Sequence, residues 1–586
     1  MCSVARSSAR PRLISHTAPI NGCDATENTN NFLKINLPMK YLKILSLLIC
    51  LPGITFSQTK PTVPAKPKLV VGIIIDQMRY DYLYRYQDKY SEGGFKRLLG
   101  QGFLFRDTHY NYIPTYTGPG HSAVYSGTTP SYNGIIANDW YDRELGRSVY
   151  VTEDTTVQGV GGTGKGGQMS PRHLLSTTVT DELRLATNRR SKVIGIALKD
   201  RGAILPAGHL PTAAYWFDNN SGDWITSTYY TKVLPEWVKS FNQQKMSDQY
   251  LSKPWETLLP LDTYQGGLTN GSAYRKPYKG ETSNKFPHDL PGLKAANGYE
   301  LLRETPFGNT YTLDFAIQAM QAEKLGKGTN TDFLAVSFSS TDYVGHQFGI
   351  ESIEVQDTYA RLDREIARLL TYLDQHYGKD NVLVFLTADH GAVETPGHMA
   401  ELKAPGGIFN NKGLKEKLND ALSEQFGKGK WLLDYQNLQF WLNDDLISAQ
   451  KKSKAEIADA VCQHLRKMAG VYRVLPVANL SKNTNEQLND QLFNGINPVR
   501  SGDVVMQLLP GWFEGSIPAA GGTTHGTGYD YDTHVPLIWY GWKVKHGSTG
   551  NLVHITDIAV TVSDLLNISH PSAATGQVLS DYLLTR

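Results

Sequence analysis

Continuous runs of apolar residues recur along the chain and predict buried strands. The first run ends in Asp76, a carboxylate placed directly after seven apolar or glycine residues. Runs of this length without polar interruption are typical of parallel strands that are covered on both faces. Five such runs are present, at residues 69–75, 193–198, 333–338, 382–387 and 535–540.

The segments between these runs have helical periodicity. In the clearest case apolar residues recur every three or four positions between Val355 and Leu373, with charged residues between them. Strands that alternate with amphipathic helices predict an α/β fold, a largely parallel central sheet sandwiched by helices.

Two stretches break this alternation and are interpreted as inserted cap segments. Residues at about 206–305 are rich in Tyr, Trp, Ser, Gly and Pro, with Trp216, Phe217 and Trp224 near their start. Residues at about 402–512 contain helices of their own, such as 454–468. The aromatic residues of the first stretch predict either a lid or a small core.

The first 57 residues are interpreted as targeting sequence. Residues 39–57, MKYLKILSLLICLPGITFS, have the basic start, the apolar run and the small terminal residues of a secretory signal peptide. Such a run is too short for a transmembrane helix, so we expect export to the periplasm. Residues 1–38 are polar and patternless, which indicates an over-called start, and the catalytic domain is assigned to 66–586.

The balance of positive and negative charge argues against a nucleic acid or a membrane surface as the binding partner. Lys and Arg total 58 against 56 Asp and Glu, so the formal charge is only +2. Proteins that bind nucleic acids or membrane surfaces normally carry a strong basic excess. We therefore expect a small-molecule ligand and no nucleic acid.

Metal-type ligands stand where the predicted strands end. In open α/β sheets, ligands bind beyond the carboxyl ends of the strands. Three carboxylates and three imidazoles come from four separated segments and occupy such places: Asp76, Asp342, His346, Asp389, His390 and His525. Any one of them could be a helix cap or a core histidine, but six at matching strand ends indicate a metal site.

The ligand types favour zinc over magnesium, because histidine nitrogens and aspartate oxygens are mixed. Six ligands are too many for one tetrahedral ion but suffice for two. Paired ions about 4 Å apart clamp the attacking and leaving oxygens of a phosphoryl transfer.

A hydroxyl stands close to a predicted helix start. The segment Tyr116-Thr117-Gly-Pro-Gly-His121 places Thr117 where free N–H groups and the helix dipole stabilise an anion. Thr117 is therefore a candidate nucleophile, with a simple helix cap as the alternative.

Taken together and in this order, the motifs resemble the alkaline phosphatase superfamily, and closely its PafA-like, phosphate-irrepressible branch of bacterial periplasms. The resemblance covers nearly all of the mature chain. The motifs that carry it are IIID (Asp76), YTGPGH (Thr117), IIANDWY (Asn138), ALKDRG (Lys199, Arg201), STDYVGH (Asp342, His346), TADHG (Asp389, His390) and TTHG (His525).

The resemblance implies a monomeric alkaline phosphatase with two Zn²⁺ ions that acts on small phosphate monoesters. One ion would be held by Asp342, His346 and His525. The other would be held by Asp76, Thr117, Asp389 and His390, with Thr117 as the covalent nucleophile that forms a phosphothreonine.

Substrate contacts are implied as well. Lys199 and Arg201 follow a predicted strand and would favour a monoester dianion, with Asn138 donating to a phosphoryl oxygen. The alternative is a phosphodiesterase or nucleotide pyrophosphatase on the same two-zinc core, a branch that lacks the Lys-x-Arg pair. A sulfatase is excluded, because no C/S-x-P-x-R motif surrounds Thr117.

Overall fold

A mixed sheet of ten strands forms the centre of the protein in a computed structural model that describes residues 66–482, 486–515 and 521–584. The strands lie in the order β18-β2-β17-β10-β1-β9-β6-β7-β8-β5. Their bounds, in that order, are Gly547–His554, Phe103–His109, Leu537–Gly541, Val382–Thr387, Leu69–Ile75, Asp332–Phe338, Val193–Ala197, Ala213–Phe217, Trp224–Ser227 and Gly159–Val160.

The middle of this sheet is parallel, as predicted. β1 pairs in parallel with β10 on one side and β9 on the other, and β9, β6 and β7 continue the same direction. Every residue of β1, β9 and β10 is buried. The last predicted run forms β17, which is antiparallel to both of its neighbours. An apolar run reports burial and not strand direction, so the sequence did not distinguish this case.

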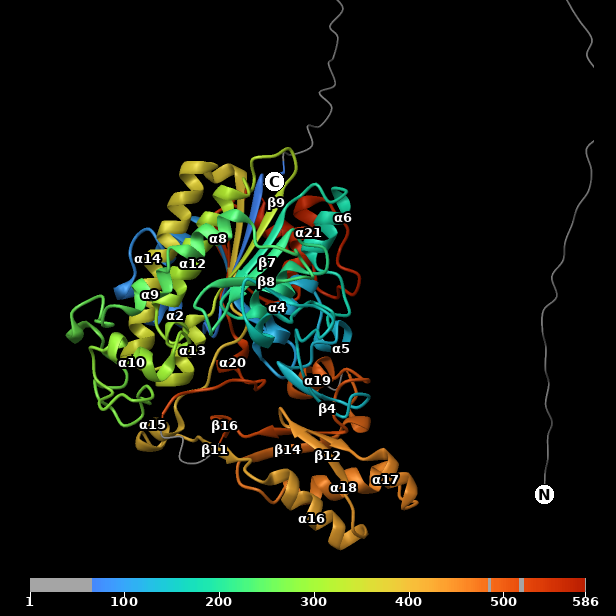
Figure 1. Cartoon of the computed structure of the whole chain (residues 1–586). Coiled ribbons are helices and arrows are strands. Elements are labelled where there is room, and N and C mark those ends of the chain that lie inside the picture. Colours follow the sequence, from blue (N-terminus) through green and yellow to red (C-terminus); the bar gives the residue numbers. More distant parts are fainter. Residues whose placement is uncertain (1–65, 483–485, 516–520, 585–586) are drawn as a thin grey trace, which may run out of the picture. The chain divides into compact units, whose positions relative to one another are not determined.

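Helices cover both faces of the sheet, which confirms the α/β class (Figure 1). One layer contains α8 (Glu236–Gln243), α12 (Phe307–Ala322) and α14 (Ile353–His376). The other contains α4 (Thr117–Ser126), α6 (Val179–Ala186) and α21 (Asp557–Leu566). The predicted periodic helix is α14, whose apolar positions are buried along one side.

The start of the first expected insertion belongs to the central sheet instead. β7 and β8 lie inside 206–305, and β7 pairs with β6 while β8 pairs with β7. Trp216 and Trp224 are fully buried, and the Trp224 ring stacks on Phe315 of α12 at 4.3 Å between centroids. These aromatic residues are core and not a lid. β7 and β8, the strands that contain these residues, lack the aliphatic runs from which the other strands were predicted.

Residues within 402–512 build a smaller layer with its own core. A four-stranded sheet in the order β12-β13-β15-β14 packs against α16 (Leu414–Phe426) and α18 (Lys454–Leu465). The strands are Leu432–Gln436, Gln439–Leu442, Val504–Leu508 and Val471–Pro476, and a separate apolar cluster lies between them and the helices. This layer lies at the end of the core that also bears α19 (Gln487–Gly495) (Figure 1).

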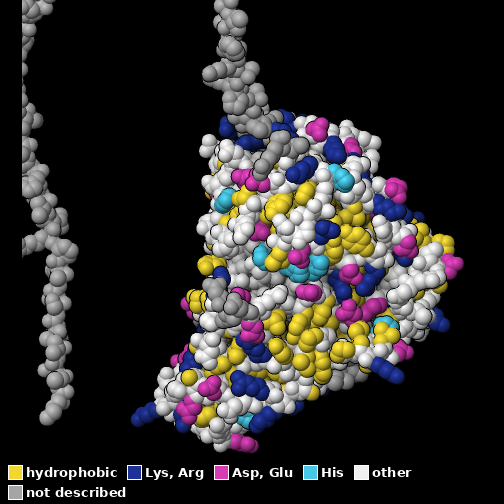
Figure 2. All heavy atoms as spheres, turned by 180° about the vertical axis from the view of Figure 1, so that it is seen from behind, with side chains coloured by type: hydrophobic (Ala, Val, Ile, Leu, Met, Phe, Trp, Pro, Cys, Tyr) yellow, Lys and Arg dark blue, Asp and Glu magenta, His cyan; other side chains and the backbone are white. Residues whose placement is uncertain are grey.

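The expected signal peptide and over-called start lie outside the described residues. None of the helices in the described ranges has the length and apolar content needed to cross a bilayer. On the face shown in Figure 2, basic and acidic side chains are interspersed, and apolar side chains gather over its lower half.

Candidate active site

Thr117 is the first residue of α4 and is almost completely buried. Tyr116 before it is extended, and the next amide, Gly118 N–H, donates to Asn138 Oδ1 at 2.8 Å. A Cβ on Gly120 would lie 2.4 Å from the backbone oxygen of Asp389, so glycine is needed where α4 approaches that carboxylate. The YTGPGH motif therefore brings the threonine hydroxyl, the helix N-terminus and Asn138 together.

Three of the predicted ligands form a group that is sealed from solvent. Asp76 follows β1, and Asp389 and His390 follow β10, its parallel neighbour. All three are 0% exposed. His390 Nε2 lies 3.5 Å from Asp76 Oδ1 and 3.5 Å from Asp389 Oδ2. One ligand atom from each lies within 4.8 Å of the others. We call these residues the buried ligand group.

The other three predicted ligands form a second group that is reached by solvent. Asp342 and His346 lie one turn apart on α13 (Ser340–Phe348), and His525 comes from the segment before α20 (Asp530–Thr533). Asp342 Oδ1 is 3.1 Å from His346 Nε2 and 3.6 Å from His525 Nε2. The His346 side chain is 37% exposed. We call these residues the open ligand group.

The histidines of both groups are oriented in the same way. His346, His390 and His525 donate Nδ1–H to the backbone carbonyls of Thr523, Gly391 and Thr115, at 2.7–2.9 Å. When these imidazoles are neutral, their Nε2 atoms therefore carry the lone pair. Metal-binding histidines are usually fixed by this kind of outer hydrogen bond. The rings of His390 and His525 stack 3.4 Å apart, which places the two groups side by side.

Lys199 joins the two groups. Its ammonium lies 2.6 Å from Asp76 Oδ2 and 2.5 Å from Asp342 Oδ2, one carboxylate from each group. The same ammonium donates to Thr117 Oγ1 at 3.3 Å. Lys199 is the residue before α7 (Asp200–Ala207), so the end of β6 carries a positive charge to the nucleophile candidate.

Arg201 is two residues after Lys199, and its guanidinium is hydrogen-bonded to Tyr150. Its Nη1 donates to Tyr150 OH at 2.9 Å, and Tyr150 OH donates to Asp200 Oδ1 at 2.9 Å. Its Nε is buried and makes no hydrogen bond within the described part of the chain. One edge of the guanidinium is therefore fixed while part of its donor capacity is unused.

Burial and charge set the protonation of the site. Burial, with the neighbouring Asp389 next, raises the pKa of Asp76, and burial raises the pKa of Asp389 to about 7. Burial lowers the pKa of His525 to about 3. Burial alone would lower the pKa of Lys199, but Asp342 and Asp76 raise it overall. Burial also lowers the pKa of His390, so His390 and His525 are neutral imidazoles. The raised pKa values of Asp76 and Asp389 show that these close, buried carboxylates need a positive partner to stay ionised together.

Unsatisfied polar atoms give separate support for a metal in the buried ligand group. Asp76 Oδ1, Asp389 Oδ2 and His390 Nε2 are buried and make no hydrogen bond to any described residue. Buried polar atoms are rarely left in this condition. All three belong to the buried ligand group, where a metal would satisfy them.

Sequence reasoning missed two residues that support these ligands. Gln77 donates its backbone N–H to Asp389 Oδ1 at 3.1 Å and its Nε2 to Asp342 Oδ1 at 2.6 Å, so it contacts both groups. Its φ of 65° is unusual for a residue other than glycine. His121, one turn after Thr117, lies 3.3 Å from Asp389 Oδ2. His121 stands inside YTGPGH, whereas no pattern marked Gln77 beyond its place after Asp76.

Over residues 70–527 the chain matches the family described as type I phosphodiesterase / nucleotide pyrophosphatase. It is 50% identical over 519 residues to a Myroides odoratus protein named calcium-transporting ATPase, covering 88% of this chain and 94% of that protein. It is 44% identical over 552 residues to alkaline phosphatase PafA of Elizabethkingia meningoseptica, covering 93% of this chain and 99% of that protein.

A crystal structure of wild-type alkaline phosphatase PafA is similar in fold, with a TM-score of 0.86 and 44% identity, over 89% of this chain and 100% of that chain. The sequence match and the structural match agree over nearly the same length. They confirm the resemblance that the motif set indicates. The chain therefore belongs to the PafA-like alkaline phosphatases within the type I phosphodiesterase / nucleotide pyrophosphatase family.

Proposed function

We propose that this alkaline phosphatase hydrolyses phosphate monoesters through a phosphothreonine at Thr117, with one zinc ion in each ligand group. The observation that carries the proposal is the position of the Lys199 ammonium. The ammonium contacts a carboxylate of each group and lies 3.3 Å from Thr117 Oγ1. The candidate nucleophile, the candidate metal ligands and a positively charged side chain therefore lie in direct contact.

In the first step Thr117 Oγ1 attacks phosphorus, the new Oγ–P bond forms, and the bond to the leaving alkoxide breaks. The hydroxyl proton passes to solvent, and the leaving group takes a proton from solvent. Lys199 donates to the attacking oxygen, and the N-terminus of α4 favours the negative charge there.

Bound zinc ions would supply Lewis-acid stabilisation of the charge on the attacking and leaving oxygens. Asp76, Asp389 and His390 would hold one ion together with Thr117. Asp342, His346 and His525 would hold the other, and the open position of this group suits the departing alcohol.

In the second step water attacks the phosphothreonine, the P–O bond to Thr117 breaks, and inorganic phosphate leaves. The threonine recovers its proton from solvent. In both steps Lys199, Arg201 and Asn138 would donate to the phosphoryl oxygens.

The cations favour a monoester over a diester. A monoester dianion has three unesterified oxygens and a diester has two, so an added pair of positive donors benefits the monoester more. Arg201 is held by Tyr150 with its Nε unused, and Asn138 accepts from Gly118 through Oδ1, which leaves its amide N–H groups to donate.

The alternative is a phosphodiesterase or nucleotide pyrophosphatase on the same core, and the description of the matching family favours it. The name of the Myroides relative adds ATP to the substrates worth testing. The terminal phosphoryl group of a nucleotide also presents three unesterified oxygens, so hydrolysis there would use the same donors.

The deciding experiment compares kcat/KM for an aryl phosphate, its methyl diester and ATP in the zinc-loaded enzyme. For Lys199→Ala and Arg201→Ala we expect losses of about 10²–10³-fold on the monoester and much smaller losses on the diester. The control is Lys192→Ala, which removes a positive charge at the opposite end of β6. Equal losses on both esters would contradict the monoester assignment, and zinc content shows whether Lys199→Ala has altered the metal sites.

We also propose export of the chain to the periplasm, with residues 66–586 as the catalytic domain and the smaller layer within 402–512 as its cap. The support is the layout of residues 39–57 and the separate apolar cluster of the cap. N-terminal sequencing of the protein purified from the periplasm tests the cleavage point near Ser57.

A further inference from the structure

A third set of metal-type ligands lies at the end of β2, apart from both ligand groups of the active site. Asp107 and His109 are two residues apart on the strand, so their side chains leave the same face. Thr108 between them points the other way and is fully buried. His534 lies directly across from His109 in an antiparallel bridge. Cross-strand neighbours share a face, so the three side chains converge.

The backbone around these residues is fixed. Tyr110 N–H donates to Thr533 O, and Val535 N–H donates to Thr108 O, each at 3.1 Å. Tyr80 N–H donates to His534 O at 3.1 Å. Asp107 and His109 therefore project from a paired strand, and His534, the residue after α20, is held beside them by its bridge to His109. Ligands held by paired backbone are positioned more accurately than ligands on loops.

The distances suit a coordination sphere. One ligand atom from each of Asp107, His109 and His534 lies within 4.8 Å of the others. His109 Nε2 is 2.9 Å from Asp107 Oδ1, and the two histidine rings are nearly parallel at 4.6 Å. Two ligands on a tetrahedral zinc, each about 2.0–2.1 Å from the ion, are about 3.3 Å apart.

Lone pairs are available on both rings. His534 Nε2 donates to the carbonyl of Arg106 at 2.9 Å, so its Nδ1 carries the lone pair. His109 Nε2 is hydrogen-bonded to Asp107 Oδ1, and His109 Nδ1 is 3.3 Å from Thr533 Oγ1, which can accept. If a metal ion took the place of the proton between His109 Nε2 and Asp107, the ring would carry its proton on Nδ1 and donate it to Thr533. Metal-bound histidines commonly have an outer contact of this kind.

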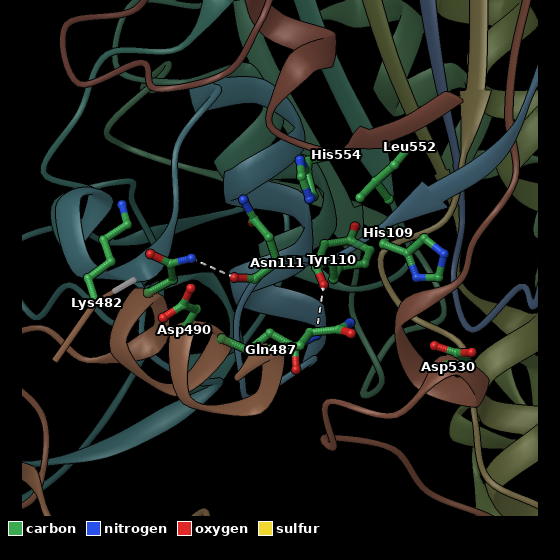
Figure 3. A pocket seen from close by; sticks show the side chains of 11 residues that line it. His109, Tyr110, Asn111, Lys482, Gln487, Asp490, Asp530, Leu552 and His554 are labelled. Atoms are coloured by element: carbon green, nitrogen blue, oxygen red, sulfur yellow. Dashed lines mark hydrogen bonds between the residues drawn. The ribbon is translucent and has the colours of Figure 1, made fainter. Parts of the chain in front are cut away.

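The surroundings are accessible to solvent. The Asp107 side chain is 44% exposed and that of His109 is 13% exposed. His109 and Asp530 lie on one side of a pocket of about 580 Å³, with Lys482 on the opposite side (Figure 3). Histidine side chains gather among acidic ones on the face seen in Figure 2.

We propose that Asp107, His109 and His534 form a third binding site, for a divalent transition-metal ion such as zinc. Two imidazoles and one carboxylate are a zinc-type donor set and a poor one for magnesium or calcium, which prefer oxygen ligands. The competing explanation is that the Asp107–His109 hydrogen bond and the stack of His109 and Tyr80 on His534 hold the three residues without a metal.

The test is the zinc stoichiometry of the full mature chain after equilibrium dialysis against Zn²⁺ alone. Wild type should bind one ion more per chain than Asp107→Asn, His109→Ala or His534→Ala, while turnover of an aryl phosphate stays unchanged. His376→Ala removes an exposed histidine on α14 and should retain the wild-type number. Asp107→Asn changes a half-exposed side chain by one atom, so it keeps the test valid if a histidine variant fails to fold.

A second readout does not depend on counting. Ions added beyond those needed for activity should raise the thermal midpoint of wild type and leave that of His534→Ala unchanged, because only a folded state with the site gains binding energy. Equal stoichiometry in wild type and all three variants would overturn the proposal. So would an equal rise in midpoint for wild type and His534→Ala.

Discussion

The two ligand groups of the active site have nearly the same composition but opposite surroundings. Every member of the buried group is 0% exposed, and it lies with Thr117 under the start of α4. The open group includes His346, whose side chain is 37% exposed, and comes partly from a segment after the cap layer. Both groups use backbone carbonyls to orient their histidines.

In the proposed mechanism, this difference in burial separates two tasks of one reaction. The nucleophile needs a fixed place without water, since a sealed environment strengthens the interactions that stabilise its charge. The leaving group and the attacking water need a route to solvent. In this proposal the nucleophile attacks from the buried side and the leaving group departs on the solvent-exposed side. The difference in burial between the two ligand groups therefore matches the direction of the displacement.

The largest effect is expected at the nucleophile on the buried side. Thr117→Ala removes the attacking oxygen, and we expect monoester turnover to fall by at least about 10⁴-fold. Acid-quenched protein incubated with labelled substrate should carry phosphate in wild type and none in the variant.

Thr117→Ser is the matched control for that experiment. It keeps the hydroxyl at the helix start and loses one methyl group, so turnover should remain appreciable and the trapped phosphate should move to serine. Thr117→Ala protein that still incorporates label would show that another residue is the nucleophile.

The next prediction compares one ligand from each group. His390→Ala and His346→Ala each remove one nitrogen, but only the His390 site is closed to a replacing water. We expect His390→Ala to lose its ion and nearly all activity, and His346→Ala to regain part of its activity at high zinc. The measurement is activity and bound zinc across a series of free zinc concentrations. Identical zinc dependence in the two variants would show that burial does not distinguish the groups.

The sheet core and the ligands could be predicted from sequence because both leave strong local signals. Apolar runs marked β1, β6, β9, β10 and β17. Asp76 follows β1 directly, and Asp389 follows β10 after one residue. The carboxyl ends of neighbouring parallel strands meet at one edge, so strand ends separated by hundreds of residues could be placed together. The division into two groups came from the resemblance, and the structure brings together the Asp and His members of each group. Metal binding by these residues and by Thr117 stays a prediction.

Other features left no local signal. β7 and β8 carry Trp216 and Trp224, whose aromatic, polar-flanked segments resembled a cap, and only their pairing with β6 shows that they extend the sheet. The direction of β17 depends on its partners and not on its residues. Gln77 and Tyr150 act through contacts to Asp342 and Arg201, which lie 265 and 51 positions away, a separation that no motif expresses.

Gln77 offers a way to perturb one group and spare the other. Its backbone serves the buried group through Asp389, and its side chain serves the open group through Asp342. Gln77→Asn keeps an amide and tolerates the left-handed backbone, but its shorter side chain cannot reach Asp342 Oδ1. We expect zinc affinity of the open group to weaken by about 10–100-fold, as for other outer-contact losses, and that of the buried group to stay unchanged.

Competition with a chromogenic chelator resolves the two affinities when the two ions leave in separate phases. Gln77→Glu is the informative partner variant, because it keeps the length of the side chain while adding a negative charge beside Asp342. Equal weakening of both phases in Gln77→Asn would mean that the residue acts through the backbone and not through its amide.

The smallest expected effect lies outside both groups, at Tyr150. Its hydroxyl holds Arg201 Nη1 at 2.9 Å and touches no ligand, so Tyr150→Phe should leave both zinc affinities unchanged. Loss of one hydrogen bond to a charged group, worth about 1.5 kcal/mol, should lower monoester kcat/KM by roughly tenfold and leave the diester value nearly intact. The loss should disappear in an Arg201→Ala background, since the tyrosine acts through that guanidinium. A full loss persisting there would assign Tyr150 a contact of its own with the substrate.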